Sequence, residues 1–228
     1  WGGSGHPAHF LHGNGFCAGT YTPFLKFLFD ELHVVASDVR GHGASTHAGD
    51  KRIGNWRIFA EDVQKIIGAT LPPPVIGMGH SLGAVSTYMA AGLYPQLFAA
   101  VVLIDPVIFP KTMLWKIALA RWLGLRRWLP PARAARRRRA EFQDKQSALQ
   151  RFTAGRSIFK TWSKQFVEAY LECGLLEKDE KTAVLRCDPE LEAQIFESIP
   201  LDVWRYGPKI SCPVLAIRGA HSDVFTAQ

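Results

Sequence analysis

A serine lies between two glycines in residues 79–83 (GHSLG), directly after the apolar run 75–78. A serine hydroxyl in this setting can attack a carbonyl carbon when the chain turns sharply from a strand into a helix and exposes the hydroxyl. The glycines suit such a turn, because side chains two residues before and after Ser81 would collide where the strand and the helix approach each other. The simpler alternative is a structural serine at a helix N-terminus.

A glycine-rich segment, residues 12–16 (HGNGF), follows the first predicted strand. Backbone N–H groups in a loop of this kind can point toward the negative oxygen that develops when a carbonyl is attacked. The N–H of Asn14 and the N–H of Leu82, the residue after the serine, would together form an oxyanion hole with two donors. We therefore expect this loop to lie beside Ser81.

Candidate acids follow two later strands. Asp223 ends residues 217–223 (IRGAHSD), late enough in the chain to orient a histidine base. Asp105, in residues 103–106 (LIDP), is the second candidate, although a turn residue at a strand end is the simpler interpretation. A further compact turn, residues 38–45 (DVRGHGAS), follows the second predicted strand.

The elements that must position these residues form an alternating pattern. Short β-branched runs alternate with segments of helical period up to about residue 105, which is typical of a parallel sheet wrapped by helices. Residues 107–210 are helical and charge-rich without a strand-like run, and the strand pattern then resumes. The predicted strands are near 9–12, 33–37, 75–78, 99–104 and 214–218, and the predicted helices are near 20–31, 55–69 and 82–94.

In their order and spacing, the segments HGNGF, DVRGHGAS, GHSLG and IRGAHSD resemble the α/β-hydrolase superfamily, from about residue 7 to the end of the chain. The resemblance implies a mostly parallel, doubly wound α/β sheet with a helical cap inserted after the family's sixth strand. The implied division is 1–106 and 211–228 for the core and 107–210 for the cap. By this resemblance Ser81 is the nucleophile, Asp223 the triad acid, and the N–H groups of Asn14 and Leu82 the oxyanion hole.

In this family the catalytic histidine follows the acid along the chain. None of the eight histidines of this sequence occupies that position, and His80, although adjacent to Ser81, is expected to point away from its hydroxyl. We expect that the 228 residues are a fragment of a longer hydrolase that lacks its first strands and its last strand and histidine. The alternative is a non-catalytic relative that binds ligands in the same pocket.

The implied reaction is hydrolysis of a carboxylic ester, thioester or lactone through an acyl-enzyme on Ser81. C–C bond hydrolysis and cofactor-free perhydrolysis are the alternatives, and no metal or organic cofactor is implied. The cap is expected to choose the substrate through an apolar acyl or alcohol pocket. The aromatic candidates for its lining are Phe109, Trp115, Trp122, Trp128, Phe159, Trp162, Phe166 and Trp204.

The formal net charge is +7, and no acidic residue interrupts the cations between Lys111 and Glu141. Nucleic acid is excluded as a partner, because no stacking or base-reading motif accompanies the charge. The cations, Arg136 to Arg139 above all, form either a solvated helix face or a site for an anionic partner. That partner would be an anionic membrane surface or the phosphates of a carrier-linked acyl group.

The four cysteines, Cys17, Cys173, Cys187 and Cys212, are scattered and lack metal-ligand spacing. They predict reduced, mostly buried thiols and a cytoplasmic protein. No apolar run reaches the roughly eighteen residues of a membrane span, although a helix that lies on a membrane surface is possible within residues 112–130.

Overall fold

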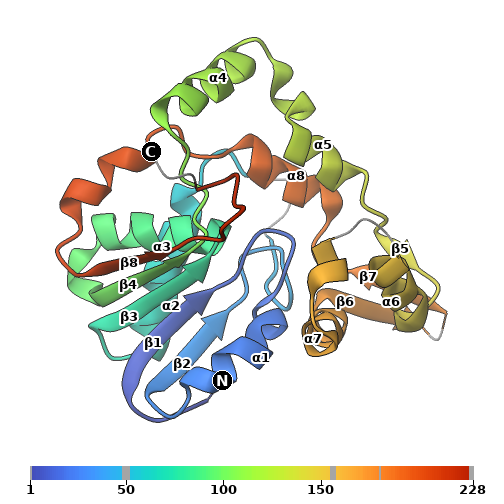
Figure 1. The fold of residues 1–228 in the computed structure, drawn as a ribbon, viewed down its shortest axis with the longest axis horizontal. Coiled ribbons are helices and arrows are strands. Elements are labelled where there is room, and N and C mark those ends of the chain that lie inside the picture. Colours follow the sequence, from blue (N-terminus) through green and yellow to red (C-terminus); the bar gives the residue numbers. More distant parts are fainter. Residues whose placement is uncertain (1, 48–51, 155–157, 180, 226–228) are drawn as a thin grey trace.

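The computed structural model describes residues 2–47, 52–154, 158–179 and 181–225. A five-stranded sheet forms its centre, with the strand order β2-β1-β3-β4-β8 (Figure 1). All four strand pairings are parallel. The strands are β1 (His6–Leu11), β2 (Leu32–Ser37), β3 (Val75–His80), β4 (Phe98–Ile104) and β8 (Val214–Ile217).

Both faces of this sheet are covered, because successive side chains of β1 pack into apolar clusters on opposite faces. Phe10 packs in one apolar cluster with Leu25 from the short helix that follows β1. Leu11 points to the other face, into a cluster that contains residues of α2 (Arg57–Thr70) and α3 (Leu82–Leu93). Burial of both faces is what a parallel sheet requires, so the predicted doubly wound α/β architecture is confirmed.

The helix predicted at residues 20–31 is wrong in its form. The chain makes only one α-helical turn, α1 (Thr22–Leu25), between the 3₁₀ turns η1 (Ala18–Tyr21) and η2 (Lys26–Leu28). The N–H groups of Phe29 and Glu31 donate to carbonyls three residues back rather than four. The segment therefore ends in 3₁₀ turns, with three residues per turn, and forms no second α-helical turn before β2.

The inserted segment is not only helical, which corrects the sequence-based expectation. It contains a second, antiparallel sheet in the order β5-β7-β6, whose inner side chains join Phe142 and Tyr170 in an apolar cluster of their own. The strands are β5 (Glu141–Phe142), β6 (Leu175–Asp179) and β7 (Thr182–Leu185). The helices are α4 (Lys111–Trp122), α5 (Pro130–Arg136), α6 (Lys145–Ala154), α7 (Lys164–Gly174) and α8 (Pro189–Glu197). The remaining 3₁₀ turns are η3 (Pro95–Leu97), η4 (Leu125–Trp128), η5 (Ile158–Thr161), η6 (Val203–Arg205) and η7 (Gly207–Lys209).

The carboxyl ends of the central strands meet at one edge of the sheet. Leu11 is paired with Gly79, and Ile104 is paired with both His80 and Ile217. The loops after β1, β3, β4 and β8 therefore leave the sheet side by side, which is where parallel α/β sheets bind ligands. The inserted helices lie beyond this edge (Figure 1). In the described part of the chain, none of the helices has the length and apolar character needed to cross a bilayer.

Candidate active site

Ser81 is held in a strained backbone conformation between β3 and α3. Its φ is +53° and its ψ is −113°, a region that residues other than glycine rarely adopt. The Ser81 N–H donates to the carbonyl of Ile104 at 2.9 Å, and its own carbonyl accepts from Val85 N–H at 3.2 Å. The turn is therefore fixed on one side by β4 and on the other by the first turn of α3.

The two glycines around Ser81 permit this turn. A Cβ atom on Gly79 would lie 2.4 Å from the carbonyl carbon of Gly83, and one on Gly83 would lie 2.0 Å from the carbonyl oxygen of Leu11. Both separations are far below contact distance, so any side chain would push strand and helix apart. This is the collision that the sequence predicted.

In the loop after β1, the amide of Asn14 is uncommitted. Gly13 N–H donates to the Tyr21 hydroxyl at 3.2 Å, Gly15 N–H to His42 Nε2 at 3.0 Å, and Phe16 N–H to the Gly13 carbonyl at 3.2 Å. Within the described residues, the Asn14 N–H has no such partner. Leu82 begins α3, where N–H groups lack an intrahelical acceptor. Both predicted oxyanion-hole amides are thus free of competing acceptors among the described residues.

Two buried imidazoles support this loop from beneath. His12 Nδ1–H donates to the Gly13 carbonyl at 2.7 Å, while its Nε2 accepts from Val39 N–H at 2.9 Å. His42 Nδ1 lies 3.2 Å from the Arg40 carbonyl, and its Nε2 accepts from Gly15 N–H. Burial lowers the pKa of His12 to about 4 and that of His42 to about 3, so both are neutral at pH 7. They are structural acceptors, a role that sequence reasoning missed.

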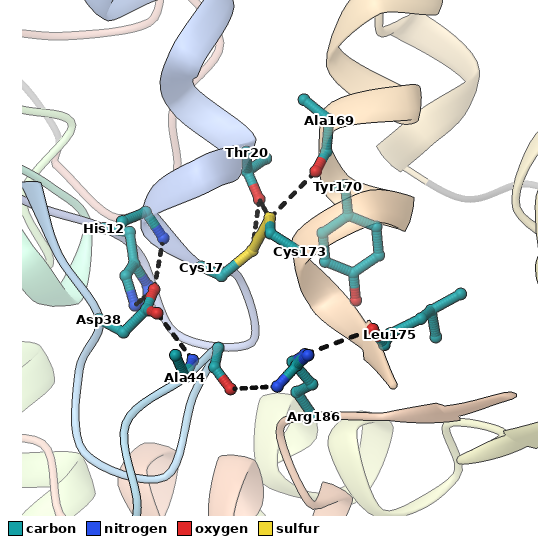
Figure 2. Close-up of a disulfide and its surroundings, with 12 residues drawn as sticks. His12, Cys17, Thr20, Asp38, Ala44, Ala169, Tyr170, Cys173, Leu175 and Arg186 are labelled. Atoms are coloured by element: carbon teal, nitrogen blue, oxygen red, sulfur yellow. Dashed lines mark hydrogen bonds and ion pairs between the residues drawn. A yellow bond between two sulfur atoms is a disulfide. The ribbon is translucent and has the colours of Figure 1, made fainter. Parts of the chain in front are cut away.

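Asp38 ties the same loop to the turn at residues 38–45. One carboxylate oxygen accepts from Ala18 N–H at 2.7 Å and the other from Ala44 N–H at 2.8 Å (Figure 2). The left-handed Gly43, with φ of +52°, leaves room for this carboxylate, because a Cβ there would lie 2.2 Å from Asp38 Oδ2. The motif DVRGHGAS therefore acts as the scaffold of the loop that carries Asn14.

The inserted segment reaches the same loop through a buried polar cluster. The Asn14 side-chain amide donates to the carbonyl of Glu192 in α8 at 3.0 Å. The Glu192 carboxylate pairs with Arg138, which also donates to the Tyr170 hydroxyl at 2.7 Å. Burial raises the pKa of Glu192, and the neighbouring Arg138 opposes that shift. Glu192 and Tyr170 were not sequence-based candidates, and Arg138 was expected only as part of the exposed arginine run 136–139, because the partners of these residues lie far away along the chain.

A disulfide between Cys17 and Cys173 links the loop after β1 to α7 (Figure 2). The expectation of four reduced thiols is therefore wrong for this pair, while Cys187 and Cys212 are free. A separation of 156 residues leaves no local spacing signal from which the pairing could be predicted. The Thr20 hydroxyl lies 3.2 Å from Cys17 Sγ.

His80 contacts the glycine-rich loop. Its Nδ1 lies 2.7 Å from the Tyr21 hydroxyl, and its ring packs against Phe16. Burial lowers the pKa of His80, and the Asp105 carboxylate partly opposes this effect. No hydrogen bond within the described residues joins an imidazole to the Ser81 hydroxyl.

The two candidate acids follow adjacent strands. Asp105, directly after β4, has a left-handed φ of +46° and donates its N–H to the Ile217 carbonyl at 2.7 Å. Its Oδ1 is buried and lacks a hydrogen-bond partner among the described residues. Asp223 is exposed in the turn after β8, one strand further from Ser81. Among the residues that the structure describes, no group of three or more His, Cys, Asp or Glu side chains could hold a metal ion.

The eight aromatic candidates of the inserted segment divide into three groups. Trp162 lies next to the site loop, with its ring 5.3 Å from that of Phe16, and it contacts Phe159 and Phe166. Phe109 packs against the main core. The remaining four, Trp115, Trp122, Trp128 and Trp204, are exposed.

Fold and site together define an α/β protein with a strained serine at a strand-to-helix turn beside a glycine-rich loop. A family model described as "Alpha/beta hydrolase family" matches residues 10–211, and the chain belongs to this family.

Curated relatives resemble about half of the chain. A serine hydrolase-like protein of Danio rerio is 33% identical over 113 residues, which cover 49% of this chain and 35% of that protein. A 2-(acetamidomethylene)succinate hydrolase of Mesorhizobium japonicum is 35% identical over 105 residues, which cover 45% of this chain and 36% of that protein. The human monoglyceride lipase is 29% identical over 123 residues, covering 50% and 40%. The matches thus span less than half the length of these relatives.

Solved structures share the fold over almost the whole chain. The crystal structure of E-2-(acetamidomethylene)succinate hydrolase gives a TM-score of 0.77 at 23% identity, covering 99% of this chain and 77% of that chain. The thioesterase domain from a curacin biosynthetic pathway gives a TM-score of 0.73 at 18% identity, covering 99% of this chain and 79% of that chain.

Proposed function

We propose that this protein is a serine hydrolase that cleaves a carboxylic ester or a related acyl bond through an acyl-enzyme on Ser81. The observation that carries the proposal is the strained conformation of Ser81, with φ of +53°, between two glycines that have no room for a Cβ. Strain at a residue that glycine would occupy at lower cost indicates that the hydroxyl is required there. The named hydrolases and esterases among the relatives support the general class.

In the proposed mechanism the Ser81 oxygen attacks the carbonyl carbon and the N–H groups of Asn14 and Leu82 stabilise the oxyanion. The alcohol or thiol then leaves, and water later releases the acyl group from Ser81. The proton of Ser81 passes to a histidine oriented by Asp223. We propose that His9, His12, His42 and His80 are not this base, because they already have hydrogen-bond partners within the fold.

The alternative functions use the same site. A non-catalytic relative would bind a ligand beside Ser81 without turnover, and C–C bond hydrolysis or perhydrolysis would use the same serine. Trp162, which contacts the loop through Phe16, is our candidate for the wall of an apolar substrate site. The cytoplasmic location remains a prediction, and its basis in reduced thiols fails for the pair Cys17 and Cys173.

Labelling and turnover of the full-length protein test this function. We expect a fluorophosphonate probe to label Ser81 and the protein to hydrolyse short or medium p-nitrophenyl esters. Ser81→Ala should abolish both, whereas Ser211→Ala, at an exposed serine after the inserted segment, should change neither. Equal turnover by Ser81→Ala would reject the acyl-enzyme, and ligand binding without labelling of the wild type would favour the non-catalytic alternative.

The 228 residues alone should hydrolyse these esters about 10⁶-fold more slowly than the full-length protein, because serine is a poor nucleophile without its base. The kcat of the two proteins under the same conditions is the measurement. Equal rates would show that one of the eight histidines serves as the base.

A further inference from the structure

Helix α4 lies at the outer edge of the molecule (Figure 1). The helix and the turn η4 carry exposed apolar side chains. Trp115 is 78% exposed, Leu119 56% and Trp122 81%, and their spacing of four and three residues places them along one stripe of the helix. Further exposed apolar side chains follow in and beside η4, namely Leu123, Leu125 and Trp128. A groove of about 440 Å³ is lined by Trp115, Lys116, Ala118, Leu119 and Trp122.

This stripe is separate from the residues that attach α4 to the fold. Leu114 and Ile117 on the opposite side of the helix are buried, and Leu114 belongs to the main core. Arg121 also fixes the helix by donating to the Ile199 carbonyl at 2.5 Å. Exposed apolar patches of this kind mark surfaces that bind a partner. The outward tryptophans are therefore available for a function other than folding.

Some cations near the stripe are paired with carboxylates of the protein, and others are not. Arg136 pairs with Glu190 and Glu197, and Arg138 pairs with Glu192, so two of the four arginines in 136–139 are occupied by carboxylates of the protein. The segment 136–139 therefore offers an anionic partner fewer free cations than the arginine run indicated. Within the described residues, the cations near the stripe that lack a carboxylate partner include Lys111, Lys116, Arg127 and Arg133.

We propose that the face formed by α4 and η4 binds the surface of an anionic lipid bilayer, with Trp115, Leu119 and Trp122 inserted at the headgroup level. Tryptophan suits this position because its ring is apolar while its N–H stays hydrated. Lys111 and Lys116 would contact the anionic headgroups, and their long side chains can extend past the apolar stripe to reach them. A helix of twelve residues, about 18 Å long, lies in the interface rather than crossing the bilayer.

A bilayer accounts for these observations better than a carrier phosphate does. A phosphate site needs donors that converge on one point, whereas here the cations flank a stripe whose centre is apolar over two turns of helix. The proposal does not depend on hydrolysis, so its test uses the full-length protein with Ser81→Ala. Failure of the proposed function would therefore leave the test unaffected.

Co-sedimentation with two kinds of vesicle is the experiment. We expect binding to vesicles of equal parts phosphatidylserine and phosphatidylcholine at low salt, little binding to phosphatidylcholine alone, and weaker binding as salt rises. Trp115→Ser with Trp122→Ser, and separately Lys111→Gln with Lys116→Gln, should each weaken the partition on the order of tenfold. The tryptophan fluorescence of the bound protein should shift to the blue, and bromine-labelled lipid should quench it.

Matched controls use positions away from this face. Phe27→Ser removes an aromatic ring that is 81% exposed on η2. Lys178→Gln with Lys181→Gln removes two exposed lysines, one in β6 and one directly before β7. Equal weakening by these controls, or no binding of the parent protein to the anionic vesicles at low salt, would overturn the proposal. It would also be overturned if inorganic phosphate competed while the tryptophan changes had no effect. Conversion of a dimer to a monomer by the tryptophan changes, without an effect on vesicle binding, would instead assign the face to a second copy of the chain.

Discussion

Gly83 is the residue at which one added methyl group should have the largest effect near Ser81. Its Cβ would lie 2.0 Å from the Leu11 carbonyl oxygen, which belongs to the backbone and cannot move without displacing β1. We predict that Gly83→Ala lowers the free energy of unfolding by about 3 kcal/mol or more, measured by urea denaturation. The matched control is Gly68→Ala within α2, where a Cβ meets nothing within 4 Å. This change should stabilise the protein by up to about 1 kcal/mol, and equal effects of the two changes would contradict the packing argument.

The two acids make distinguishable predictions. If Asp223 orients the base, Asp223→Asn should lower kcat by about 10⁴-fold with little change in KM, because the imidazole loses both its orientation and its counter-charge. Asp105→Asn should have a smaller effect on kcat, because its role would be limited to the turn after β4. The reverse order of the two effects would move the acid to Asp105, whose buried Oδ1 has no partner among the described residues.

Sequence could predict the reacting groups but not the residues that hold them. Ser81, its glycines and the Asn14 loop were found because each local motif has a mechanical reason that operates within a few residues. The contact of Asn14 with Glu192 spans 178 residues, and that of Gly15 with His42 spans 27. Such contacts depend on the path of the chain in space, so residue type alone gave no signal for Glu192 or for the pairing of Arg138 with Glu192 and Tyr170.

At the scale of elements, the disulfide is the strongest link between the loop after β1 and α7. We predict that Cys173→Ser lowers the free energy of unfolding by about 2–4 kcal/mol, because a closed loop of 156 residues restricts the unfolded chain. Urea denaturation of the oxidised protein gives the comparison, and mass spectrometry after alkylation identifies the pair. Cys212→Ser, at a partly exposed free thiol, is the control and should change stability little. A Cys17 thiol that is alkylated without prior reduction would refute the link.

The helices and strands were predictable where buried apolar residues recur in a clear pattern along the sequence. The five parallel strands were all predicted, because their apolar runs are short and bounded by turns. The strands β5, β6 and β7 were missed, since β5 has two residues and β6 exposes four of its five side chains. Their pairing with each other and their packing on Phe142 and Tyr170 outweigh a weak local preference for strand.

The whole molecule carries three buried imidazoles whose protonation should control its acid stability. Burial lowers the pKa of His9 and His12 to about 4 and of His42 to about 3. An unfolded histidine titrates near 6.5, so between about pH 6.5 and these lower values the unfolded chain binds more protons than the native protein. Stability contributed by the neutral imidazoles is therefore complete above about pH 6.5 and is lost as pH falls through about 4.

His9 offers the sharpest test of this acid sensitivity. Its Nε2 lies 2.8 Å from the Ser37 hydroxyl, while its Nδ1 is buried without a hydrogen-bond partner among the described residues, so a second proton would have no acceptor. We predict that His9→Gln, which can keep the contact with Ser37, makes the fall in stability between about pH 6.5 and about pH 4 shallower by nearly one proton. Urea unfolding midpoints across this range give the slope, with His33→Gln at an exposed position of β2 as the control. Equal slopes for the two variants would show that His9 already binds its proton in the native protein, and the acid sensitivity would then rest on His12 and His42, the imidazoles that support the Asn14 loop.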